Sequence, residues 1–211
     1  GTVAKGKCKE WPDFKKDMAE HDVPDWYIWS CEKIKYMFPK AHAAAYVMMA
    51  YRIAYCKINY PLAYYGAYFG IRADAFSYEI MCQGKEKLQY YINDYNRRSA
   101  SLSKKEQDTM KDMHIVQEMY ARGYEFTPAR LGKSLATKFS VDNGKVLLPF
   151  VAIEGVGENA AKAFQSEYEI KEFDTVEEAV KRAKLNRTAV EGLRNHGVFE
   201  GLAETDQLSM F

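Results

Sequence analysis

The feature that most constrains the fold is a short Gly-Val-Gly turn, Gly155 to Gly157, set between two apolar stretches. Glycine adopts positive φ angles without steric cost, so both glycines permit a sharp reversal that other residues resist. Ile153 and Val156 are expected to anchor the turn in a core. Small side chains at Ala160 and Ala161 would let the next helix approach closely. The pattern predicts two helices that meet at a tight turn and pack together.

This arrangement has the form of a helix-hairpin-helix DNA-binding element. Backbone N–H groups at the start of its second helix have no partner within the helix, and a DNA phosphate oxygen can accept them. Such contacts do not depend on base identity. The predicted DNA-binding residues of this turn are Gly155, Val156, Gly157, Glu158 and Asn159. The alternative is that residues 148–200 form only a small four-helix packing unit.

A second, degenerate copy of this element is expected further along the chain. Residues 176–183 and 188–195 have the pattern of two amphipathic helices, joined by the short segment Lys184 to Arg187. The copy lacks the Gly-x-Gly sequence. We therefore expect its phosphate contact to come from Lys184 or Arg187.

A run without acidic residues precedes these elements. From Lys33 to Ala73 there is no Asp or Glu, whereas the formal net charge of the whole chain is only +1. A nucleic-acid or nucleotide role must therefore come from local patches, and this run favours an anionic partner. Its basic residues are Lys33, Lys35, Lys40, Arg52, Lys57 and Arg72.

Residues 41–60 within that run are predicted to form a helix. They are apolar on nearly every face, which indicates a buried helix. His42 and Arg52 lie about 80° apart around it and could face one cleft. Lysines near its positive N-terminal end would suit phosphates. The candidate nucleotide-binding residues are Lys33, Lys35, Lys40, His42 and Arg52. Alternatively, Lys40 and Arg52 only extend their charged ends to solvent while His42 caps a turn.

The rest of the chain is expected to be mainly helical. Residues 77–98 and 103–122 are predicted helices, the second opened by a Ser103 to Glu106 capping box. Residues 138–147 alternate around Asn143-Gly144, which predicts a β-hairpin with a type I′ turn. The four cysteines and four histidines show no zinc-ligand spacing, so we expect no metal and reduced thiols. No secretion signal or membrane span is expected.

The final five residues form a short peptide with a glutamine and several large apolar side chains, and the segment before it is expected to be flexible. Their spacing resembles the pentapeptide by which bacterial replication proteins dock on the sliding clamp. The alternative is an ordinary hydrophobic terminus packed on its own domain. The candidate clamp-binding residues are Gln207, Leu208, Ser209, Met210 and Phe211.

Taken in this order, the motifs resemble the C-terminal part of the PolC-type DNA polymerase III α subunit of low-GC Gram-positive bacteria. The resemblance covers essentially the whole chain and is weakest between Ser77 and Gln107. It departs from the family at Ala4, where an arginine is expected, and at Met210, where leucine is commoner. The segments that carry it are Val23–Ile28, Ser30–Val47, Arg52–Tyr55, Tyr60–Leu62, Ile153–Gly157 and Gln207–Phe211.

The resemblance implies a mainly α fold with four parts. Residues 1–75 would be the nucleotide-facing part of the fingers, 76–124 a helical remainder, 125–202 a paired helix-hairpin-helix domain that binds duplex DNA, and 203–211 a clamp-binding tail. The chain begins without methionine, which suggests a piece of something longer. The resemblance implies that the parent is a bacterial cytoplasmic protein.

The implied function is template-directed DNA synthesis by a nucleotidyltransferase. Expected partners are duplex primer-template DNA, a deoxynucleoside triphosphate, the sliding clamp and the remaining domains of the parent polymerase. No cofactor is expected in this segment, because Mg²⁺ would be held by palm carboxylates that it lacks. The segment is therefore predicted to be inactive alone and to contain no catalytic residue.

Two other functions stay open at this point. The chain could be a non-enzymatic module that binds DNA and the clamp, with its first helices acting as a scaffold. It could also be a helical interaction protein without any nucleic-acid partner. Nucleotide contacts in the assembled enzyme would separate the first of these from a polymerase segment.

Overall fold

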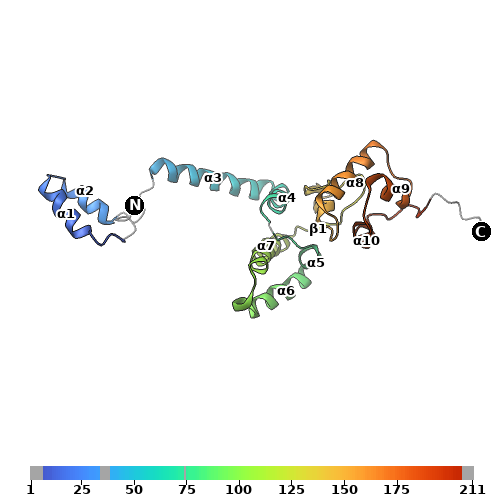
Figure 1. Cartoon of the computed structure of the whole chain (residues 1–211), viewed down its shortest axis with the longest axis horizontal. Helices are drawn as coiled ribbons and strands as arrows, with labels where there is room; N and C mark the ends of the chain where they lie inside the picture. Colours follow the sequence, from blue (N-terminus) through green and yellow to red (C-terminus); the bar gives the residue numbers. More distant parts are fainter. Residues whose placement is uncertain (1–6, 34–38, 74, 206–211) are drawn as a thin grey trace, which may run out of the picture. The chain divides into compact units, whose positions relative to one another are not determined.

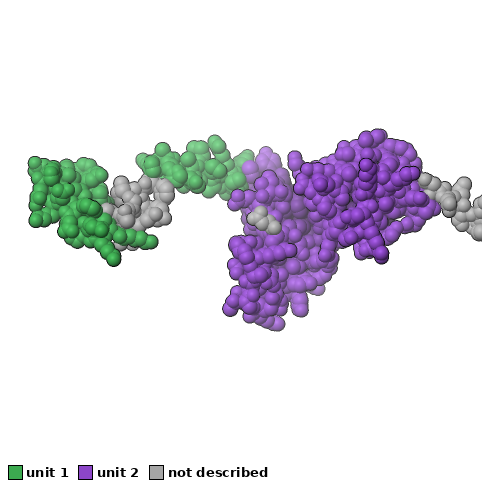
Figure 2. All heavy atoms as spheres, viewed as in Figure 1, with its two compact units in different colours: residues 1–55 green, residues 56–211 purple. Residues whose placement is uncertain are grey.

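The computed structural model describes residues 7–33, 39–73 and 75–205. These divide into two compact units, residues 1–55 and 56–211 (Figure 2). Helices dominate, with one small three-stranded sheet, so the prediction of a mainly α fold is confirmed (Figure 1). The four-part functional division drawn from the sequence stays a prediction.

The first unit contains α1 (Trp11–Glu20), α2 (Asp25–Lys33) and most of α3 (Lys40–Asn59). Glu32 joins the first two helices, because its carboxylate accepts hydrogen bonds from Lys15 Nζ at 2.6 Å and from Trp11 Nε1 at 3.2 Å. The hydrogen bond from Lys15 is the largest influence that lowers the pKa of Glu32.

Helix α3 forms where the sequence predicts it, but the prediction that it is buried is wrong. None of its residues is buried, and Tyr46, Met49 and Tyr51 are 65%, 63% and 74% exposed. An apolar helix is buried only when other elements cover it. The described residues supply no such cover for α3.

The second unit begins with helices α4 (Pro61–Ile71), α5 (Tyr78–Met81), α6 (Lys85–Arg97) and α7 (Lys104–Ala121). The prediction of a single helix at 77–98 is wrong, because the helix is interrupted between α5 and α6, where Gly84 adopts a φ of +95°. The predicted capping box of α7 is confirmed. Ser103 accepts from the Glu106 N–H, and Glu106 accepts from the Ser103 N–H.

A sheet follows, formed by β1 (Phe126–Thr127), β2 (Ser140–Asp142) and β3 (Lys145–Leu147) in the order β1-β3-β2. The predicted hairpin is confirmed: β2 and β3 are antiparallel, and Asn143 and Gly144 have φ angles of +49° and +75°. Strand β1 pairs with β3 in parallel and was not predicted. A two-residue strand is too short to show alternation.

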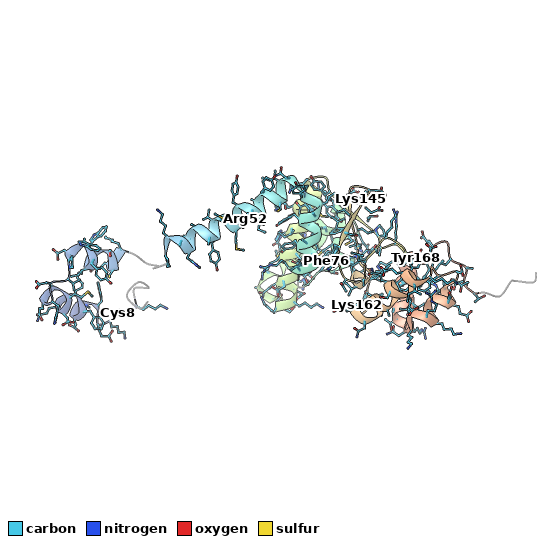
Figure 3. The ribbon with its side chains drawn as sticks, turned by 90° about the horizontal axis from the view of Figure 1, so that it is seen from above. Cys8, Arg52, Phe76, Lys145, Lys162 and Tyr168 are labelled. Carbon is cyan, nitrogen blue, oxygen red and sulfur yellow. The ribbon has the colours of Figure 1, made fainter. Side chains whose placement is uncertain are left out.

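The C-terminal part of this unit contains a 3₁₀ turn (Phe150–Ala152), α8 (Glu158–Ile170), α9 (Val176–Ala183) and α10 (Arg187–Asn195). We call these elements and their connections, residues 150–195, the hairpin unit. Its core includes buried Phe150, Phe164 and Leu193. Phe76, labelled in Figure 3, packs against this core and also against the core formed by α4, α6 and α7.

Candidate nucleic-acid interface

The first hairpin turn, Ile153 to Glu158, is built largely as the sequence predicts. Gly155 has a φ of +85°, and Ile153 and Val156 are only 3% and 4% exposed. These two side chains belong to the core of the hairpin unit and hold the turn against it. The predicted positive φ at Gly157 is wrong. Gly157 is the N-cap of α8 in an extended conformation, with φ −71° and ψ 162°.

Backbone N–H groups at this turn differ in their availability. Val156 N–H donates to the Ile153 carbonyl oxygen at 3.1 Å, so it is already used and is not open to a phosphate. Within the described residues, no hydrogen-bond acceptor is seen for the N–H groups of Gly157 and Glu158. A Cβ atom added at Gly157 would meet nothing within 4 Å. The start of α8 is therefore open to an anion.

Close contact with α10 explains why the first hairpin turn needs glycine at position 155. A Cβ atom at Gly155 would lie 2.9 Å from both the Cγ2 atom and the carbonyl oxygen of Thr188. One at Gly192 would lie 2.2 Å from the Glu154 carbonyl oxygen. Gly192 was not among the predicted site residues. A glycine inside a helix lowers stability by about 1 kcal/mol relative to alanine. Its presence inside a predicted helix was therefore a signal that close packing requires it.

The second hairpin turn, Lys184 to Arg187, repeats the backbone of the first without its glycines. Lys184 has a φ of +49°, Leu185 is buried, and Asn186 is an N-cap with φ −78° and ψ 165°. These positions correspond in order to Gly155, Val156 and Gly157. The predicted degenerate copy is thus present in the fold, with its second helix starting at Arg187, one residue earlier than expected.

The two turns differ in what occupies the start of their second helix. Asn186 Oδ1 accepts from the Ala189 N–H at 2.8 Å, whereas Gly157 has no side chain that could cap α8. Arg187 carries a cation that is 91% exposed, and among the described residues its ion-pair partner is Glu191 of the same helix, at 2.8 Å. Such an exposed pair is weak, so Arg187 can be redirected to a phosphate.

Glu158 places a carboxylate in the first turn of α8. Lys162 Nζ donates to it at 2.6 Å, and this hydrogen bond lowers the pKa of Glu158. Because the cation of Lys162 offsets the carboxylate charge locally, the helix start keeps its attraction for an anion. Lys162 is labelled on α8 in Figure 3.

The predicted nucleotide-binding residues are exposed where the structure describes them. Lys33 ends α2, Lys40 and His42 are in the first turn of α3, and Arg52 is labelled on that helix in Figure 3. His42 and Arg52 are ten residues apart, which is about 15 Å along the axis. Helix geometry alone does not bring them together. Lys35 lies outside the described residues.

The predicted clamp-binding residues 207–211 also lie outside the described residues. The chain that leads to them is tied to the hairpin unit. Thr175 and Ala203 form a parallel β-bridge, and the Val176 N–H donates to the Ala203 carbonyl oxygen at 2.9 Å. Glu204 accepts from Arg194 at 2.7 Å.

In the part of the chain that the structure describes, no cluster of three or more His, Cys, Asp or Glu side chains is arranged to hold a metal ion. Among the same residues, no helix has the length and apolar character needed to cross a bilayer.

Comparison with known proteins agrees with this geometry. The family model described as "Helix-hairpin-helix motif" matches residues 123–208, which include both turns. The chain is 44% identical over 209 residues to the DNA polymerase III PolC-type of Halalkalibacterium halodurans, covering 99% of the chain and 14% of that protein. This chain is homologous to a segment of PolC-type DNA polymerase III. The resemblance stated from the sequence is confirmed.

Two further PolC-type relatives show the same pattern. The protein of Clostridium perfringens is 46% identical over 194 residues, which is 92% of the chain and 13% of that protein. The Bacillus subtilis protein is 44% identical over 209 residues, which is 99% of the chain and 14% of that protein. The chain therefore spans about one seventh of the length of the PolC-type relatives it matches.

Proposed function

We propose that this chain is part of a bacterial replicative DNA polymerase, acting in the cytoplasm, and that its hairpin unit binds duplex primer-template DNA without regard to sequence. The observation that carries the proposal is the pair of turns with matching backbone conformation in a segment homologous to PolC. Each turn leads into the start of a helix, where backbone N–H groups attract phosphate.

Binding of the chain to a labelled duplex tests this function, and it should weaken steeply with salt while hardly varying with sequence. We expect Lys184→Ala and Arg187→Ala each to reduce the magnitude of the slope of log affinity against log salt by about one, because each removes one phosphate contact. Lys85→Ala, at an exposed lysine on α6, is the control. A wild-type affinity that does not change with salt would refute the proposal.

We further propose that the start of α3 contacts the triphosphate of the incoming nucleotide in the parent polymerase, with Lys40 as the main cation. Lys40 is exposed at the positive end of the helix, in a segment free of acidic residues. Lys40→Ala should lower kcat/KM for deoxynucleoside triphosphates by roughly tenfold or more, the loss expected for one hydrogen bond to a charged group. Unchanged kinetics, equal to those of a Lys16→Ala control on α1, would exclude this role.

Clamp docking by residues 207–211 is the third part of the proposal. Its support is the sequence Gln-Leu-Ser-Met-Phe, which follows directly on a segment tied to the hairpin unit through Ala203 and Glu204. Removal of these five residues from the parent should reduce the length of DNA synthesised per binding event when the clamp is present. Synthesis without the clamp should be unaffected. Equal loss in both assays would indicate a structural role instead.

The chemistry of synthesis is assigned to the rest of the parent protein. In such sites Mg²⁺ is held by one or two carboxylates together with substrate phosphates, and we propose that these carboxylates come from a palm domain outside this chain. The chain alone is accordingly proposed to bind DNA without extending a primer.

A further inference from the structure

A cleft of about 860 Å³ lies in the second unit between the first hairpin turn and helices α5 to α7. Two helix starts border it. Gly155 to Gly157, which lead into α8, form part of one wall, and Lys105 and Glu106 from the first turn of α7 form part of another. Because each helix start carries a partial positive charge, a cleft bordered by two of them favours an anion.

The start of α7 has backbone donors without an acceptor in the part of the chain that the structure describes. Its capping box uses the N–H groups of Ser103 and Glu106. Within the described residues, the N–H groups of Lys104 and Lys105 have no acceptor, and the Lys105 ammonium forms no ion pair. Lys105 is exposed and lines the cleft. One side-chain cation and free backbone donors therefore lie at the same place.

Carboxylates also line this cleft. Whether each one is paired with a cation decides the net charge that a phosphate would meet there. Glu106 accepts from Arg98 at 3.0 Å, and its backbone hydrogen bond with Ser103 is the first cause that lowers its pKa. Glu79 lies 3.8 Å from Lys87 Nζ. Glu154 has no ion-pair partner among the described residues and is exposed. Lys105 and Glu154 are thus the two uncompensated charges, of opposite sign.

We propose that the DNA strand whose phosphate is held by the first hairpin turn continues through this cleft, and that a neighbouring phosphate binds Lys105 and the start of α7. This inference rests on the proposed function, because it extends the duplex contact of the hairpin unit to a second helix start. Lys105 then binds the DNA backbone, whereas the carboxylate of Glu154 repels it.

Duplex binding of the full chain tests the assignment. Lys105→Ala should weaken binding roughly tenfold, as expected for loss of one hydrogen bond to a charged group. It should also reduce the magnitude of the slope of log affinity against log salt by about one. Lys104→Ala is the matched control, since Lys104 is in the same helical turn but pairs with Asp108 at 3.2 Å and does not line the cleft. Glu154→Gln should strengthen binding, because it removes a carboxylate near the phosphate path.

The outcomes separate this inference from the proposed function. If the wild-type chain binds duplex and the Lys184 and Arg187 variants weaken it, but Lys105→Ala behaves like Lys104→Ala, the cleft does not carry the strand and only this inference fails. If the wild-type chain shows no salt-dependent duplex binding, the proposed function fails and this inference fails with it. Weaker binding by Glu154→Gln would also overturn the assignment.

Discussion

Replacing Gly192 with alanine is expected to destabilise the chain by about 2 kcal/mol, although alanine is the better helix former. The helix propensity of alanine would add about 1 kcal/mol of stability. Against this, the new Cβ atom would lie 2.2 Å from the Glu154 carbonyl oxygen and 3.2 Å from Ile153 Cγ2. The nearest atom belongs to the backbone of the first hairpin turn, which cannot rotate away. Overpacking of this kind typically costs about 1–3 kcal/mol and requires a backbone shift. The 2.2 Å approach to a backbone atom places the cost at the upper end, about 3 kcal/mol, which leaves a net loss of about 2 kcal/mol after the gain in helix propensity.

Thermal unfolding followed by circular dichroism measures the effect, and the midpoint should fall by several degrees. Gly70→Ala is the matched control, because Gly70 also lies inside a helix, α4, and a Cβ atom there would be 3.7 Å from the nearest atom, Phe139 Cδ2, which is an ordinary contact. Duplex affinity of the Gly192→Ala chain should fall as well, since α10 would push the turn out of position. Stability equal to that of the wild type would show that the close packing of α10 on the turn is not rigid.

Features encoded within a few residues were predictable from the sequence. The capping box at Ser103, the Asn143-Gly144 turn and the positive φ of Gly155 depend on local sterics and hydrogen bonds, and each is present as expected. Even the degenerate second turn was located, because amphipathic periodicity marks both of its helices. Lys184 shows that a backbone shape typical of glycine can be adopted by another residue.

Features that depend on distant contacts were not predictable in this way. The break at Gly84 is different, because a glycine inside a helical pattern is itself a local signal of interruption and was overlooked. Strand β1 exists only because β3 lies beside it. The apolar pattern of α3 suggested burial, but a pattern cannot say which element provides the cover. Gly192 was overlooked for the same reason, since its partner Glu154 is on another helix-turn element.

The candidate site combines both kinds of feature, and Gly157 is the clearest case. The sequence singled it out correctly, but for a φ angle that it does not have. Its extended conformation is one that any residue can adopt, so backbone freedom does not explain the glycine. What glycine provides here is the absence of a side chain beside the open N–H groups at the start of α8.

Gly157→Asp should therefore separate stability from DNA binding. An N-cap aspartate accepts a hydrogen bond from the first turn and is preferred over glycine by a few tenths of a kcal/mol. The conformation and the open space at Gly157 both accommodate it. Stability should be equal to or slightly above that of the wild type. Duplex affinity should fall about 10- to 100-fold, because the carboxylate takes up a first-turn N–H group next to the open donors of Gly157 and Glu158 and repels the phosphate charge.

Gly157→Asn distinguishes the two causes of this loss. Asparagine caps the helix as well as aspartate does but carries no charge. If occupied donors are responsible, both variants should bind duplex equally poorly. If repulsion dominates, asparagine should bind better than aspartate, most clearly at low salt where screening is weak. Asn186 caps the helix of the second turn in the same way. An affinity for Gly157→Asn between those of the wild type and Gly157→Asp would therefore mean that a capped helix start still admits phosphate. Wild-type affinity in the aspartate variant would show that DNA does not approach the start of α8.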